Sequence, residues 1–240
     1  QTAGSLLLDF PGHRNVSDFY RDLDLATATA TVGYAVDGIR YKREMFTSFS
    51  DQVAVVRLTA SERRRISFRI SFATPMQNYR VTTQGNDRLL IDGRTDGHET
   101  IPGQVEYRTV AEISPEGGTT VADSAGITVT GADAVTILVS IATNFNDYKD
   151  ISGDPVSRAE AYLTQAKKKS YKRLRADHIA AYRPWIERVS LDLGVNAQAA
   201  KTTDARVREF ATHFDPQLVS LYFQFGRYLL ICSSQPGGQA

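Results

Sequence analysis

Alternating hydrophobic residues in the first 150 positions constrain the fold of this chain more than any other feature. In Ile66–Phe72, every second residue is isoleucine or phenylalanine, and the residues between them are serine or arginine. This period of two is typical of a strand that buries one face. Val135–Ile141 follows a similar pattern. Asp37-Gly38 separates two further strand-like runs, which predicts that Ala26–Val36 and Ile39–Ser48 pair as a β-hairpin.

Short strand-like runs continue to about residue 150. Turn-forming glycine, proline, asparagine and aspartate residues separate them, which is typical of an antiparallel sandwich. The predicted fold class is therefore mainly β with α, with an N-terminal antiparallel β-sandwich over residues 1–150. The other predicted strands are Val53–Thr59, Val81–Thr83, Leu89–Ile91, Val105–Ile113 and Ile127–Thr130.

The hydrophobic period changes to three and four residues near position 150. Asp154 and Pro155 are residue types favoured at the cap and at the first position of a helix. Hydrophobic residues then recur at helical spacing, and Pro184 is expected to kink or restart the helix. Val189–Gly194 alternates again and is predicted to be a returning strand. Residues 151–195 are therefore predicted to form a helical linker.

The last part of the chain, residues 196–240, contains a second helix start at Asp215-Pro216. Leu218–Ile231 is hydrophobic on nearly all sides, as in a helix that is buried in a large structure. The few helical residues after position 200 cannot cover such a surface, and the residues before Ala240 have a loop composition. We therefore expect the chain to be part of a longer protein, cut just after the start of a second domain.

Charge and composition exclude several classes of protein. The formal net charge is +1, which argues against a dedicated nucleic-acid-binding protein. A basic run consists of Lys167–Lys169, Lys172, Arg173 and Arg175. A nucleic-acid patch is the alternative, but a solvated helical face is the better interpretation. The chain has no stretch of about 18 hydrophobic residues, so we predict no membrane span. Cys232 is the only cysteine, which excludes a disulfide scaffold.

Metal-binding residues do not occur in a convincing arrangement. Asp92–Glu99 is rich in oxygen ligands, but its third position is Arg94 and its twelfth is Gly103, unlike an EF-hand. We therefore interpret it as a surface hairpin loop. The four histidines, which lack metal-ligand spacing, are His13, His98, His178 and His213.

Candidate catalytic groups are also weak. His178 lies on a hydrophobic helical stripe, where a core or interface residue is more common than a catalytic base. Asp22 and Asp24 would share the face of a strand, and Glu44 lies beside Arg43. Structural ion pairs or turns explain these carboxylates better than paired glycosidase acids do.

Several segments, taken in order, carry a resemblance to a known enzyme family. They are Tyr20–Leu25, Tyr41–Ser48, Asp51–Val53, His178–Tyr182, Arg188–Gly194, Thr203–Arg206, Asp215–Leu218 and Leu221–Ile231. Together they resemble the N-terminal part of glycoside hydrolase family 95, the inverting α-L-fucosidases. The last two segments are the most specific, and the resemblance runs along nearly the whole chain.

The resemblance implies a β-sandwich, a helical linker and the first helix or helices of a truncated (α/α)6 barrel, which begins in residues 196–240. It implies hydrolysis, with inversion, of α-L-fucosidic bonds, typically α-1,2-linked, in a fucosylated oligosaccharide or glycan. Some proteins that resemble this fold act on α-L-galactosides. The family needs no metal or organic cofactor. Its catalytic residues lie downstream of Ala240, so the resemblance predicts no catalytic residue in this chain and no activity of the chain alone.

The resemblance also predicts a structural joint and a location. Arg227 and Gln224 lie on the last predicted helix, where they are expected to pack against the remainder of the catalytic domain. A cation on a hydrophobic helix needs a partner, and we expect Arg227 to pair with a barrel carboxylate. Gln235 stands where the family usually has arginine. The family is typically secreted or periplasmic.

A non-catalytic carbohydrate-binding or scaffolding module is the alternative function. A β-sandwich is a common fold for such modules, although fold alone does not establish function. A sugar platform requires exposed aromatic side chains on one face. The candidates in the predicted sandwich are Tyr34, Tyr41, Tyr79 and Tyr107.

Overall fold

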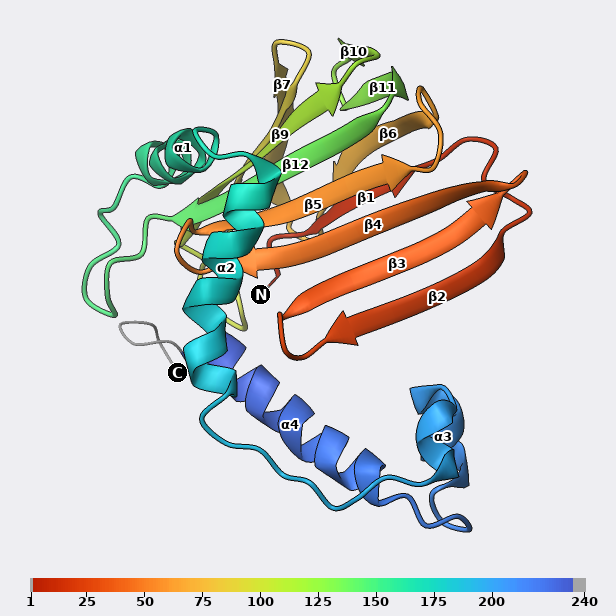
Figure 1. Ribbon diagram of the computed structural model, residues 1–240. Helices are drawn as coiled ribbons and strands as arrows, with labels where there is room; N and C mark the ends of the chain where they lie inside the picture. The colour runs from red at the N-terminus through yellow and green to blue at the C-terminus, as the bar shows by residue number, and fades with distance from the viewer. Residues whose placement is uncertain (1, 235–240) are drawn as a thin grey trace. The chain divides into compact units, whose positions relative to one another are not determined.

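The computed structural model describes residues 2–234 of the chain (Figure 1). Contacts divide it into two compact units. The sandwich unit comprises Gln1–Asp22 and Ala30–His178, and the helical unit comprises Leu23–Thr29 and Ile179–Ala240. Gln235 and Ala240, which entered the sequence analysis, lie outside the described residues. Within residues 2–234, none of the helices is long and hydrophobic enough to cross a lipid bilayer.

Two antiparallel sheets form the sandwich unit (Figure 1). The strands of the four-stranded sheet, in spatial order, are β1 (Ser5–Asp9), β6 (Ile66–Ala73), β11 (Gly126–Ala132) and β10 (Thr119–Ala122). Those of the eight-stranded sheet are β2 (Ser17–Asp24), β3 (Thr29–Val36), β4 (Ile39–Ser48), β5 (Val53–Ala60), β12 (Ala134–Thr143), β9 (Glu106–Glu116), β8 (Arg88–Arg94) and β7 (Asn78–Gln84). The fold is therefore mainly β, as the hydrophobic alternation predicts.

The predicted hairpin is confirmed. β3 and β4 are antiparallel, and Val36 lies opposite Ile39 at the turn. Asp37 and Gly38 have φ values of 50° and 80°. A two-residue turn with positive φ at both positions matches the twist of the flanking strands. Glycine adopts this conformation readily, and aspartate tolerates it better than most residues do.

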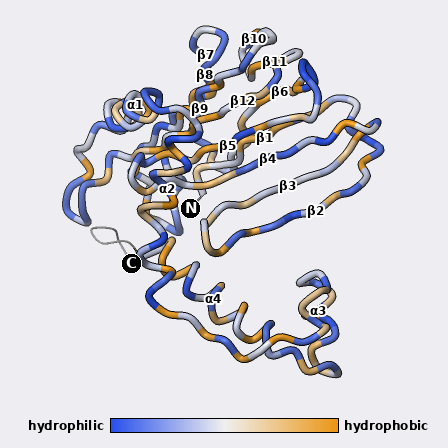
Figure 2. The backbone as a smooth tube through the Cα atoms, viewed as in Figure 1, coloured by the Kyte–Doolittle hydropathy of each residue, from blue (hydrophilic) through white to orange (hydrophobic). Residues whose placement is uncertain are grey.

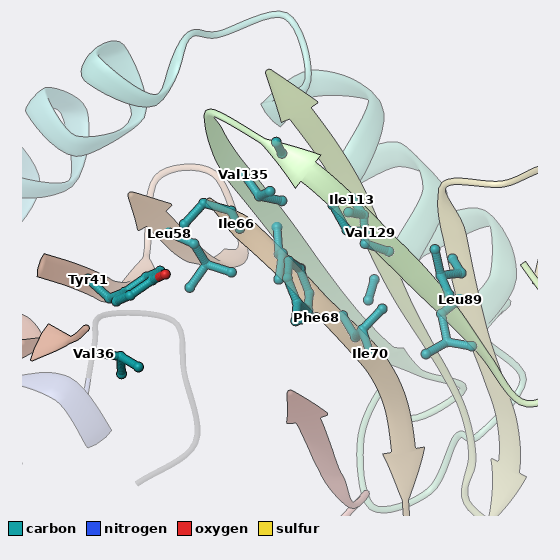
Figure 3. Packing of buried hydrophobic residues seen from close by; sticks show 14 of the residues in the cluster. Val36, Tyr41, Leu58, Ile66, Phe68, Ile70, Leu89, Ile113, Val129 and Val135 are labelled. Atoms are coloured by element: carbon teal, nitrogen blue, oxygen red, sulfur yellow. The ribbon is translucent and has the colours of Figure 1, made fainter. Parts of the chain in front are cut away.

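Hydrophobic side chains from both sheets meet in the core of the sandwich (Figure 3). Ile66, Phe68 and Ile70 of β6 are each at most 1% exposed. Phe68 also stacks on Phe10, with ring centroids 5.2 Å apart. The alternate residues of Ile66–Phe72 thus point inward, which is why the period of two predicted this strand correctly.

Two helices follow the sandwich strands. α1 (Pro155–Ala166) begins at its N-cap residue Asp154, whose carboxylate accepts hydrogen bonds from two backbone N–H groups. α1 packs on β12 and β9, where Leu163 joins a second hydrophobic cluster. α2 (Tyr171–Ile186) crosses from the sandwich unit into the helical unit. Pro184 lies inside α2, so the predicted restart at this proline is wrong.

The helical unit contains η1 (Ala197–Ala200), α3 (Thr203–Glu209) and α4 (Pro216–Ser233). Residues 189–194 are irregular, so the predicted returning strand is wrong. The alternation there has no neighbouring strand to pair with among the described residues, and alternation alone does not make a ladder.

Hydrophobic residues recur along α4 (Figure 2). Tyr228 and Ile231 pack against a small cluster formed by Ala28, Tyr182 and Ile186. Tyr222 and Leu230, by contrast, are 77% and 64% exposed. Within residues 2–234, the helix is therefore buried on one side only, whereas the sequence led us to expect burial all round.

Candidate functional site

Arg227 and Gln224, the two residues predicted at a joint, act together in the helical unit. Arg227 Nη1 donates to the carbonyl oxygens of Ile186 and Val189 at 2.8 and 2.6 Å, and Nη2 donates to that of Trp185 at 2.9 Å. Gln224 accepts from Arg227 at 2.7 Å and donates to Val189 O at 3.1 Å.

This arrangement caps the C-terminal end of α2. The last carbonyl groups of a helix have no partners within it and carry partial negative charge. The Arg227 guanidinium satisfies two of them, those of Trp185 and Ile186, at once, because its N–H donors form a rigid fork. We expected a carboxylate partner from the barrel. That carboxylate stays a prediction; among the described residues, Arg227 donates to three backbone carbonyls and one amide oxygen.

A buried ion pair lies at the start of α4. The two carboxylate oxygens of Asp215 accept from Arg206 Nε and Nη2 at 2.8 and 2.9 Å. The Asp215 carboxylate also accepts from the backbone N–H of Leu218, so it caps the helix as its sequence position predicts. The hydrogen bond from Arg206 lowers the pKa of Asp215. Asp215 is therefore a structural anion rather than a proton donor.

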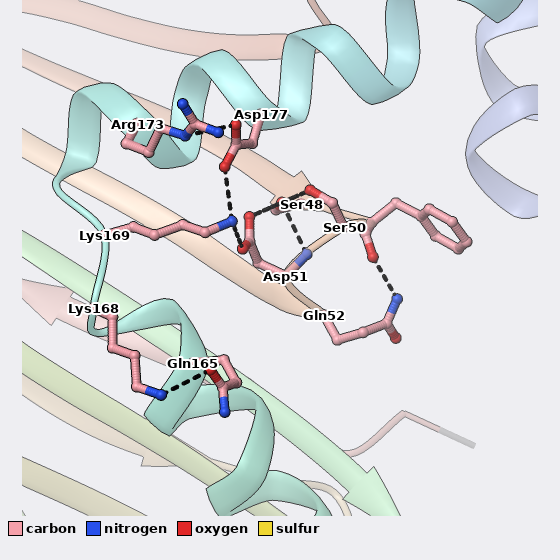
Figure 4. Close-up of polar contacts among 10 residues, drawn as sticks. Ser48, Ser50, Asp51, Gln52, Gln165, Lys168, Lys169, Arg173 and Asp177 are labelled. Atoms are coloured by element: carbon pink, nitrogen blue, oxygen red, sulfur yellow. Dashed lines mark hydrogen bonds and ion pairs between the residues drawn. The ribbon is translucent and has the colours of Figure 1, made fainter.

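A polar network in the sandwich unit links the β4–β5 turn to the start of α2 (Figure 4). Lys169 Nζ donates to Asp51 Oδ1 at 2.6 Å and to Asp177 Oδ2 at 2.7 Å. Ser48 Oγ donates to the other oxygen of Asp51 at 2.6 Å, and Arg173 Nε lies 2.9 Å from Asp177 Oδ1. The Lys169 ammonium group therefore lies between the carboxylates of Asp51 and Asp177.

The basic run Lys167–Lys169 is therefore not simply a solvated helical face. It lies in the turn after α1, and Lys167 pairs with the buried Glu112 of β9. Lys168 matches the expectation, since it is exposed and donates to Gln165. Lys172 and Arg173 of the same run are also exposed on α2. Nothing in the sequence links Lys169 to Asp51, because their contact spans more than a hundred positions and follows no local spacing.

Replacing Lys169 by methionine is expected to lower the melting temperature of the chain by a few degrees at pH 7. It leaves Asp51 buried without its cation. Lys168→Met is the matched control and is expected to cause no measurable change, because an exposed contact contributes little. Thermal unfolding followed by circular dichroism measures both. Equal melting temperatures for the two variants would contradict the structural role of Lys169.

The pH dependence of this effect has a definite sign. Hydrogen bonds from Lys169 lower the pKa of Asp177 in the folded state. The contribution of Asp177 to the stability of the fold is therefore present above about pH 4, and it is lost as pH falls through the lowered pKa. Hydrogen bonding to Asp177 and Asp51 raises the pKa of Lys169, so its contribution is lost only as pH rises through a value above about 10. The melting temperatures of the wild type and Lys169→Met are therefore expected to converge in acid.

The histidines lie apart from one another. His13 Nδ1 is 2.9 Å from the hydroxyl oxygen of Tyr34, and burial lowers its pKa. His178 is buried and stacks on Phe46 with centroids 4.7 Å apart, as expected of a core histidine. His213 contacts Thr212. In the described part of the chain, no three His, Cys, Asp or Glu side chains are grouped to hold a metal ion.

Asp92, Asp24 and Glu44 are engaged in structural contacts, and Asp22 is exposed on β2. Asp92, in the predicted hairpin loop, instead belongs to β8 and pairs with Arg108. Asp24 accepts from the backbone N–H of Ala26 at the end of β2. Glu44 lies 3.0 Å from Lys42.

The aromatic candidates for a sugar platform are mostly buried. Tyr34, Tyr41 and Tyr107 are 6%, 8% and 4% exposed, so a platform built from these three is wrong. Their side chains face the hydrophobic clusters, as strand aromatics commonly do. Tyr79 is 48% exposed. Tyr20, which no sequence pattern marked as a candidate, is 50% exposed on β2.

Comparisons with known proteins place these features in a family. Residues 1–148 match the family model of the glycosyl hydrolase family 65 N-terminal domain, and residues 170–240 match that of the glycosyl hydrolase family 95 catalytic domain. An α-L-fucosidase 2 from Arabidopsis thaliana is 32% identical over 269 aligned residues, which cover 100% of this chain and 32% of that protein. The chain belongs to the glycosyl hydrolase family 65 N-terminal domain family over residues 1–148, and its residues 170–240 match a family 95 catalytic domain.

The chain is also similar to other known proteins. An α-fucosidase A from Aspergillus niger is 26% identical over 99% of the chain and 31% of its own length. The chain thus spans about a third of the length of these curated relatives. A kojibiose phosphorylase from the human microbiome is a similar solved structure, with a TM-score of 0.49, 13% identity, and coverage of 72% of this chain and 25% of that one.

The polar network contains residues from both matched segments. Asp51 belongs to the segment that matches the N-terminal domain, and Asp177 belongs to the segment that matches the catalytic domain. Lys169 lies between the two segments and bonds to both carboxylates. Arg227 and Gln224 lie within the catalytic-domain segment.

Proposed function

We propose that the longer protein represented by this chain hydrolyses α-L-fucosidic bonds in oligosaccharides, typically α-1,2-linked, with inversion of the anomeric centre. The match of residues 170–240 to a family 95 catalytic domain carries this proposal. Relatives named α-L-fucosidase and α-fucosidase, aligned along the whole chain, support it. The substrate would be a fucosylated oligosaccharide or glycan, and hydrolysis would need no organic cofactor or metal ion.

We further propose that residues 1–240 alone release no fucose. The carboxylates in these polar networks form ion pairs with cations. Asp51 and Asp177 both bind Lys169, and Asp215 binds Arg206. An inverting glycosidase needs a protonated acid and a separate base with room for water between them. We propose that these groups lie in the part of the relatives that this chain does not span.

The domain arrangement and location complete the proposal. Residues 1–150 would be the N-terminal sandwich, residues 151–195 the linker, and residues 196–240 the start of the barrel. The exposed side of α4, which includes Tyr222 and Leu230, would pack against the remainder of the catalytic domain. The protein would act in a secreted or periplasmic location.

The activity is tested with two purified proteins, residues 1–240 and the full-length gene product. Each is incubated with 2′-fucosyllactose, and proton NMR follows the released sugar. We expect β-L-fucose to appear first with the long protein and no fucose with residues 1–240. Fucose release by the short chain would contradict its inactivity. Initial α-L-fucose would contradict inversion, and turnover of only the matching α-L-galactoside would replace the proposed substrate.

A further inference from the structure

A depression of about 670 Å³ lies on the eight-stranded sheet, within the sandwich unit. Its size is within the range of about 300 to 1,000 Å³ that is usual for small-molecule sites. Strands β2 to β5 contribute its floor and walls. The side chains that the argument uses are those of Asp18, Tyr20, Arg40, Lys42 and Thr59.

The depression is on the face of the sheet that points away from the sandwich core. Lys42 lies opposite Gly33 on β3 and opposite Thr59 on β5, so these three residues share one face. Tyr34 and Tyr41 alternate with them and belong to the core cluster. Tyr34 and Tyr41 also line the depression, but the Lys42 and Thr59 side chains on the outer face are not required to fill the core.

Tyr20 provides an aromatic surface in a fixed position. A Cβ atom on Gly33 would lie only 2.1 Å from Cε1 and 2.5 Å from Cζ of the Tyr20 ring. The ring thus rests directly on the Gly33 backbone, where only glycine leaves room for it. At 50% exposure, the other side of the ring is available to a ligand.

The polar groups around the ring are nearly balanced in charge. Lys42 lies 3.0 Å from Glu44, which offsets its positive charge. Asp18 and Arg40, both exposed, then contribute one charge of each sign. A site with balanced charges, hydrogen-bond donors and acceptors, and one open aromatic face suits a ligand that is neutral, carries many hydroxyl groups and has an apolar ring face.

We propose that this depression binds a neutral oligosaccharide, with one sugar ring stacked on Tyr20 and its hydroxyl groups bonded to Asp18, Arg40 and Thr59. Glycan binding would then be a second role of the protein, carried by the sandwich unit and separate from the proposed hydrolysis. Only the choice of a fucosylated probe rests on the proposed function.

The test is an NMR titration of residues 1–240 with 2′-fucosyllactose and with lactose, each to about 20 mM, where a site of millimolar affinity is nearly saturated. We expect saturable shifts at the backbone amides of Gly33, Lys42 and Thr59. Tyr20→Ala is expected to weaken binding at least about fivefold through loss of the stacked ring. Gly33→Ala is expected to weaken it as well, because the new methyl group displaces the ring.

Tyr79→Ala is the matched control. Tyr79 is 48% exposed on β7, at the opposite edge of the same sheet. The affinity of this variant is expected to equal that of the wild type. Shifts centred on Tyr79, binding that survives Tyr20→Ala, or no saturable shift with either glycan would overturn the proposal.

The two proposals fail separately. If the long protein releases no fucose but lactose or 2′-fucosyllactose shifts the Gly33 region, the binding site stands and the proposed activity fails. If fucose is released but neither glycan binds here, only the site is overturned.

Discussion

Replacing Arg206 by alanine is expected to lower the unfolding temperature of the helical unit by at least about 5 °C. The substitution leaves the buried Asp215 carboxylate without its two guanidinium hydrogen bonds. The side chains of the pair are 6% and 2% exposed, so water does not replace the lost partner. Trp185 is the only tryptophan and lies in this unit, so its fluorescence during heating reports the transition.

Arg208→Ala is the control on the same short helix. Arg208 pairs with Asp204 at 2.9 Å, but both side chains are about two-thirds exposed. Exposed pairs four residues apart on a helix contribute little to stability, so the midpoint should stay within about 1 °C of the wild type. Similar shifts for the two arginine variants would mean that burial of the Arg206–Asp215 pair does not determine its contribution.

Phe68→Ala is expected to destabilise the sandwich unit by about 3 to 5 kcal/mol, because it opens a cavity in the core between the two sheets. Phe68 is 1% exposed, packs among residues of both sheets, and stacks on Phe10 (Figure 3). Urea unfolding followed by far-ultraviolet circular dichroism gives the change in unfolding free energy.

Phe19→Ala provides the comparison, because Phe19 is 60% exposed on the edge strand β2. Its replacement removes the same atoms but opens no cavity in the core, so the expected loss is below about 1 kcal/mol. A Phe68→Ala variant as stable as Phe19→Ala would show that the core relaxes around the missing ring.

Local patterns predicted most elements of the fold. The alternation of Ile66–Phe72 and the Asp37-Gly38 turn identified β6 and the β3–β4 hairpin, because burial of one face and positive φ are local requirements. Asp154 and Asp215 marked the starts of α1 and α4 for a similar reason, since a cap bonds to N–H groups within three residues. The same reasoning failed at residues 189–194, where a strand needs a distant partner to pair with.

Arg227 and Gln224 carry the hydrogen-bonding groups that the sequence predicted to need partners. The sequence did not predict which groups within the described residues they contact. A cation on the hydrophobic surface of α4 signals that Arg227 needs acceptors. Which acceptors it finds depends on where α2 ends, and backbone carbonyls carry no sequence signal. For Lys169, too, the three-dimensional path of the chain supplied Asp51 and Asp177.

The sequence by itself determined the resemblance to glycoside hydrolases, the mainly β class and the starts of the helices, because sequence motifs, strand alternation and caps are recorded in neighbouring residues. Only the tertiary structure decided which tyrosines are accessible. Tyr34, Tyr41 and Tyr107 turn into hydrophobic clusters, while Tyr20 rests on Gly33 with one side open. All four are aromatic residues in strands. The register of each strand determines whether its tyrosine points toward the core or away from it. The exposure of that tyrosine also depends on what covers its face of the sheet. Distant parts of the chain set both.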